Sequence, residues 1–171
     1  MHVDVSTVIA QMAAQLEQLG TWLTKATDFA TTKKFDPNTL LTARLAPDQF
    51  PLLRQIGAAC DSVKLAVTRL TGIAGPVFAD DQTTLAECQA RIAAVVAFVR
   101  SVGPDAYASG PTAKVVFPWM PGKYLTGPDY VVQFLIPNFQ FHLTHAYALL
   151  RHNGVDLGKA DFLGALTFHE L

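Results

Sequence analysis

The chain has 171 residues, of which 50% are hydrophobic and 16% are charged, with a formal net charge of −1. These values are typical of one compact domain, 1–171, and exclude a disordered chain. The near-neutral charge argues against nucleic-acid binding, which requires an excess of basic side chains. No hydrophobic run reaches the ~20 residues that cross a bilayer, and the first residues do not resemble a signal peptide. We therefore expect a cytoplasmic protein that contacts neither membrane nor nucleic acid, with Cys60 and Cys88 as free, buried thiols.

Four segments carry hydrophobic residues at the period of an amphipathic helix. They cover residues 5–29, 47–70, 85–99 and 129–153. Thr84 and Glu87 form a capping-box pattern at the start of the third segment. Pro137 lies inside the fourth segment and removes one backbone hydrogen bond, so we expect either a kink there or two shorter helices.

The connections complete an all-α, antiparallel four-helix bundle. Residues 30–46 are too many for a tight turn and predict a long crossover after the first helix. Residues 114–127 hold two short β-rich runs around a Pro-Gly pair, which predicts a small hairpin between the third and fourth helices. A short C-terminal helix is expected over residues 159–166.

One face of the fourth helix carries the best candidate for chemistry. At helical spacing, Val131, Asn138, His142, His145 and Leu149 lie on the same side. The stripe is hydrophobic at both ends and polar in the middle, which is typical neither of a solvent-exposed face nor of a purely hydrophobic one. It therefore predicts a polar pocket or buried network inside the bundle.

Three interpretations of this stripe are open. The first is a buried hydrogen-bond network of Asn138 and the histidines that fixes helix register. The second is a divalent metal, zinc or nickel, held by His142 and His145 with water in the open position. The third is a small-molecule cavity in which His142 acts as the catalytic acid or base. Gln49, placed one turn before the inner face of the second helix, and Trp119, on the hairpin, are further ligand-binding candidates. The chain offers no third histidine or matched acid for a metal, which favours the absence of a cofactor.

Three stretches of the chain resemble an uncharacterised bacterial family of the DinB/YfiT-like metalloenzyme superfamily: LAPDQFPLLRQIGAACDSVK (45–64), LIPNFQFHLTHAYALLRHNGV (135–155) and LGKADFLG (157–164). The resemblance covers nearly the whole chain. It implies the four-helix bundle already expected, often as a homodimer, with no established activity.

The wider superfamily includes metal-dependent enzymes such as thiol-dependent transferases and isomerases. The resemblance implies a site made of one histidine from the second helix and an H-x-x-x-H pair from the fourth. In this chain Asn138 and His142 occupy the register of that pair, and the second helix has no histidine. We therefore expect a DinB-like bundle of unknown function with a polar pocket. A divalent-metal enzyme and a structural homodimer are the alternatives.

Overall fold

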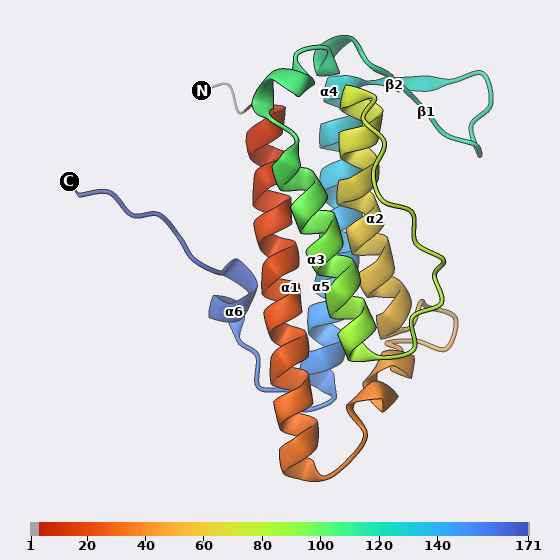
Figure 1. Ribbon diagram of the computed structural model, residues 1–171. Coiled ribbons are helices and arrows are strands. Elements are labelled where there is room, and N and C mark those ends of the chain that lie inside the picture. Colours follow the sequence, from red (N-terminus) through yellow and green to blue (C-terminus); the bar gives the residue numbers. More distant parts are fainter. Residues whose placement is uncertain (1–3, 171) are drawn as a thin grey trace.

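A computed structural model describes residues 4–170 of the chain. Four long helices form a bundle (Figure 1): α1 (Val5–Lys33), α2 (Leu52–Thr71), α3 (Leu85–Ser101) and α5 (Ile136–His152). Helices α1 and α5 run in one direction, and α2 and α3 run in the other. Helix α2 packs mainly against α5 and α3, whereas α1 packs mainly against α3. The predicted four-helix bundle is confirmed. The shorter elements are η1 (Pro37–Thr42), η2 (Pro104–Tyr107), η3 (Gly110–Thr112), α4 (Gly127–Asp129), η4 (Tyr130–Leu135) and α6 (Lys159–Leu163).

Helix α2 begins later than its hydrophobic pattern predicts, and Pro51 is the reason. A helix that started at Pro47 would need a backbone N–H at residue 51, and proline has none. Pro51 instead occupies the N-cap position, and Leu52 is the first helical residue. Gln49 therefore lies in the loop before α2 and not on the face of the helix.

The long crossover is present, and it lies between α2 and α3 rather than at residues 30–46. Because α2 and α3 are parallel, residues 72–84 run along the bundle to connect the end of one helix to the start of the other (Figure 1). Much of the segment 30–46 is helical instead, since α1 extends to Lys33 and η1 follows it. Thr84 caps α3 through the predicted capping box with Glu87.

The predicted hairpin is also present. Strands β1 (Lys114–Val116) and β2 (Tyr124–Thr126) pair antiparallel, with Val115 opposite Leu125. The hairpin projects sideways from the end of the bundle where α2 ends (Figure 1). At its base the backbone of Gly127 approaches Gly110 so closely that any Cβ on residue 127 would overlap the Gly110 carbonyl oxygen.

The fourth predicted helix changes its winding just before Pro137. Residues Tyr130–Leu135 form a π-helical turn, η4, and the chain continues into α5 without leaving the right-handed helical conformation. A π-helical turn has a wider hydrogen-bond spacing than an α-helix, so it accommodates a residue that has no N–H to donate. The irregularity expected at Pro137 takes the form of this wider turn.

The C-terminal helix α6 packs against α1 and is shorter than the predicted 159–166. Gly164 ends it with a φ of 69°. Trp22 of α1 holds α6 in place, because its ring stacks on Phe162 at 5.7 Å and its Nε1 donates to the carbonyl oxygen of Asp161 at 3.1 Å.

The buried hydrophobic side chains form one core between the four long helices. Cys60 and Cys88 lie in this core as free thiols, as predicted. Burial raises the pKa of the Cys60 thiol to about 12 and that of the Cys88 thiol to about 11. Neither thiol is therefore nucleophilic near neutral pH. Among residues 4–170, no helix combines the length and the hydropathy needed to span a lipid bilayer.

Candidate functional site

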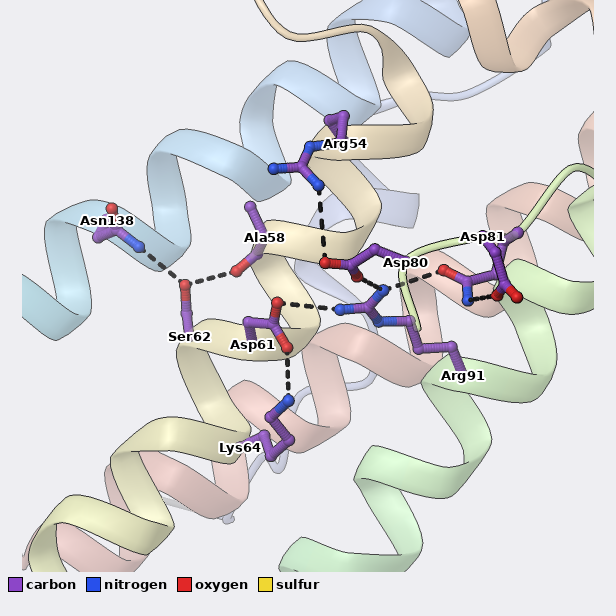
Figure 2. Close-up of polar contacts among 10 residues, drawn as sticks. Arg54, Ala58, Asp61, Ser62, Lys64, Asp80, Asp81, Arg91 and Asn138 are labelled. Atoms are coloured by element: carbon purple, nitrogen blue, oxygen red, sulfur yellow. Dashed lines mark hydrogen bonds and ion pairs between the residues drawn. The ribbon is translucent and has the colours of Figure 1, made fainter. Parts of the chain in front are cut away.

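Two hydrogen bonds between α2 and α5 form a polar row on one side of the bundle, defined by Gln55, Ser62, Asn138 and His142. Nδ1 of His142 lies 2.8 Å from Oε1 of Gln55. Nδ2 of Asn138 donates to Oγ of Ser62 at 2.8 Å, as Figure 2 shows. The Ser62 hydroxyl in turn donates a hydrogen bond to the carbonyl oxygen of Ala58 at 2.7 Å. The predicted stripe on α5 thus meets matching polar side chains on α2.

His142 is 9% exposed, and its partner Gln55 is 1% exposed. Nε2 of Gln55 donates to the carbonyl oxygen of Phe50 at 3.3 Å, which leaves Oε1 to face the imidazole. Because Oε1 can only accept, this network assigns the imidazole proton to Nδ1 and leaves Nε2 as a lone-pair acceptor. Within residues 4–170 no side chain forms a hydrogen bond to Nε2 of His142.

Burial lowers the pKa of His142, and the nearby His145 lowers it further. The imidazole of His142 is therefore neutral at neutral pH. A neutral, inward-facing imidazole with one free nitrogen can accept a proton or a hydrogen bond.

His145 lies beside the row and is only half-buried. Its Nδ1 is 2.7 Å from the carbonyl oxygen of Phe141 in its own helix, so this nitrogen also carries the proton. The Phe141 ring lies 4.1 Å from the His145 ring and 5.3 Å from the His142 ring, and it is 51% exposed. Phe141 therefore forms an apolar rim beside both histidines.

Two of the predicted ligand-binding residues are not part of the polar row. Gln49 lies in the loop before α2, and its Oε1 is buried without a hydrogen-bond partner. Trp119 lies on the hairpin, where its ring contacts Phe117 at 4.6 Å. Phe117 in turn covers the guanidinium of Arg69, near the end of α2. At ~1.5 Å per residue, Arg69 lies about 21 Å along the helix from Gln55, so Trp119 is far from the polar row.

A metal site is incomplete with the residues that the structure describes. No group of three or more His, Cys, Asp or Glu side chains within residues 4–170 could hold a metal ion. His142 and His145 offer two nitrogens, and the amides of Gln55 and Asn138 are poor ligands for zinc or nickel. The donors present therefore do not fit the three-histidine site that the resemblance implies.

A second polar cluster, which was not predicted from the sequence, surrounds Arg91 of α3 (Figure 2). The Arg91 side chain is 4% exposed and pairs with Asp61 of α2 at 2.9 Å and with Asp80 of the crossover. Its Nη1 also donates to Gln82 at 2.9 Å. The hydrogen bond from Arg91 holds the pKa of Asp80 below its usual value. These contacts fasten the crossover to α2 and α3.

The pattern around Arg91 contained a signal for this cluster. Arg91 comes three residues after Cys88 and four before Val95, both of which lie on the buried face of α3. A charged residue at such a position needs buried partners. The cluster borders a cavity of about 60 Å³, which is room for a few water molecules.

Comparison with known proteins identifies the family. Residues 5–163 match the family described as "Domain of unknown function (DUF1993)". The chain is also similar to the crystal structure of a DinB family member protein from Shewanella denitrificans, with 42% sequence identity and a TM-score of 0.91. That match covers 95% of this chain and 93% of the other. No curated protein matches the chain. The chain is therefore a member of the DUF1993 family, a helical bundle with the fold of a DinB family member.

Proposed function

We propose that the chain binds a small polar molecule at the polar row and that Nε2 of His142 is the acceptor that holds it. The main support is that the buried imidazole of His142 is neutral and that Nδ1 is hydrogen-bonded to Gln55, whereas Nε2 has no partner among the described residues. Nε2 is accessible to solvent, so a ligand N–H or O–H reaches it and forms a hydrogen bond with a net worth of ~0.5–1.5 kcal/mol.

The surroundings of His142 support a ligand of mixed character. Asn138 and His145 provide polar groups next to it along α5. Phe50 and Phe141 are 48% and 51% exposed and add apolar surface on the solvent side. In this proposal His142 is also the catalytic base, because the free imidazole is already in its basic form near neutral pH.

A titration with small fragments, monitored by ¹⁵N NMR of the histidine rings, tests the proposal. The probes are small amides, alcohols and amines that carry an N–H or O–H donor. We expect at least one probe to move the Nε2 resonance of His142 saturably and to raise the melting temperature. His142→Ala should abolish both effects, and His152→Ala, an exposed residue of the same helix, should preserve them. The proposal is wrong if every active probe acts equally on the His142→Ala variant.

A divalent-metal enzyme is the second candidate. Its support is that Nδ1 of both His142 and His145 contacts a carbonyl-type oxygen, which is the arrangement that metal-binding histidines use to direct Nε2 at the ion. The remaining ligands would come from water or from the bound molecule. Elemental analysis of protein purified without a histidine tag should then give about one zinc or nickel per chain. A His142→Ala/His145→Ala variant should lose it, and less than a tenth of an equivalent in the wild type refutes the candidate.

We also propose that the protein acts in the cytoplasm as a homodimer. Two buried free thiols support a reducing compartment, and large exposed side chains such as Leu65, Val132 and Phe141 support a partner surface. Light scattering should give twice the 18.5 kDa mass of the chain. A mass of one chain at micromolar concentration contradicts the dimer.

A further inference from the structure

The hairpin and the start of the fourth helical segment line an open cavity that lies apart from the polar row and from the small cavity beside Arg91. Its volume is about 280 Å³. Its walls are the side chains of Phe117, Trp119, Met120, Tyr124 and Phe134, with Leu125 and Lys123 completing the lining. We call this space the hairpin cavity.

The walls of the hairpin cavity are fixed by aromatic packing. Phe117 is 7% exposed, and its ring lies 4.6 Å from the ring of Trp119 and 4.7 Å from that of Phe134. The outer wall is open to solvent, because Trp119, Met120 and Tyr124 are 62%, 42% and 51% exposed. Exposed aromatic side chains around a concave space are typical of a binding site.

The charges around the hairpin cavity are positive. Among residues 4–170, Lys123 is the charged residue that lines the cavity. Nζ of Lys114 lies 5.1 Å from the centre of the Tyr124 ring, and the guanidinium of Arg69 lies 4.9 Å from the Phe117 ring. Asp129 of α4, the first acid after the hairpin in the sequence, lies outside the lining and is hydrogen-bonded to Thr126 and Gln133.

We infer that the hairpin cavity binds a small molecule with one carboxylate group and one hydrophobic group, which is an aromatic ring or a branched aliphatic chain. The aromatic walls exclude water from the hydrophobic group. The ammonium of Lys123 pairs with the carboxylate at the rim. Lys114 and Lys123 also disfavour a dimer in which the hairpin of a second chain fills the cavity, because the lysines of the two hairpins would repel each other.

The two tryptophans of the chain make this inference directly testable. Trp22 is fully buried and its indole N–H is bonded to Asp161, whereas Trp119 lines the cavity. Each indole N–H gives a separate signal in a ¹H–¹⁵N NMR spectrum, and the Trp119→Phe variant identifies which signal is which. The Trp22 signal then reports that the bundle stays folded.

The probes are naphthalene-1-acetate and its neutral analogue naphthalene-1-acetamide. We expect the acetate to shift the Trp119 signal saturably, to leave the Trp22 signal in place and to bind about fivefold more tightly than the amide. Lys123→Met should remove that difference by weakening the acetate alone. Lys159→Met, which removes an exposed lysine on α6, is the matched control and should change neither affinity.

Three results would overturn the inference. The first is the absence of any Trp119 shift at millimolar acetate. The second is equal affinity for the acetate and the amide, which would remove the role of Lys123. The third is a Trp119 signal that moves with protein concentration and not with the probe, which would show that a second copy fills the cavity. None of these results bears on His142, so the proposed function stands or falls separately.

Discussion

The hydrogen bond between Gln55 and His142 predicts a measurable coupling between the two side chains. The 2.8 Å bond joins groups that are 1% and 9% exposed. In Gln55→Leu the Nδ1–H of His142 loses its acceptor, which costs ~1–3 kcal/mol, while the buried leucine returns part of that loss. We expect Gln55→Leu and His142→Leu each to lower the free energy of unfolding by about 1–2 kcal/mol.

The double variant should be close to the wild type, because replacing both partners by apolar groups leaves neither the imidazole nor the amide unpaired. The hydrogen bond from Gln55 to the Phe50 carbonyl is lost in both variants that lack Gln55, so it cancels in the cycle. The coupling energy from urea unfolding is then about 2–4 kcal/mol, the sum of the two single losses. His152→Leu combined with Gln55→Leu is the control and should be additive within ~0.5 kcal/mol. A coupling energy below ~0.5 kcal/mol for Gln55 and His142 would refute the assigned network and the free Nε2 with it.

Three further predictions concern titration, ion pairing and thiol reactivity. Burial keeps the pKa of His142 below its unfolded value of about 6.5. The unfolded chain therefore takes up the proton first, and the free energy of unfolding should fall as pH drops through that value. His142→Leu should flatten this slope in urea titrations, and an unchanged slope contradicts the assignment. Arg91→Met should cost about 2–4 kcal/mol in thermal unfolding because two carboxylates lose a buried partner. The Arg54 side chain is 53% exposed, so Arg54→Met should lower the free energy of unfolding by less than ~0.5 kcal/mol. Equal losses of stability in the Arg91 and Arg54 variants would contradict this prediction. Cys60 and Cys88 should react with 5,5′-dithiobis(2-nitrobenzoate) only on unfolding, and a fast thiol in the folded protein would contradict their burial.

The helices and the hairpin were predictable because hydrophobic period and turn residues are local signals. The direction of the helices was not, since a hydrophobic stripe has the same period whichever way the helix runs. Two connections of similar length, residues 30–46 and 72–84, could each have been the crossover. Only the parallel pairing of α2 and α3 decides between them.

The α5 half of the candidate site was predicted from the sequence, and the α2 half was missed although the sequence held a signal for it. The inward position of His142 follows from its place between hydrophobic residues of one stripe. Gln55 and Ser62 are seven residues apart, two helical turns on one face, and this spacing was a usable signal for their partnership with α5. The position of Trp119 was not predictable, because a hairpin sequence does not specify where the hairpin docks.

The close approach of Gly127 to the Gly110 carbonyl fixes the angle at which the hairpin leaves the bundle, because no side chain fits at position 127. Relatives with a larger residue at position 127 must tilt the two strands to make space. Such a tilt would change the shape of the hairpin cavity while every residue that lines it stays the same. Ligand preference among relatives can therefore diverge through a position that never meets the ligand.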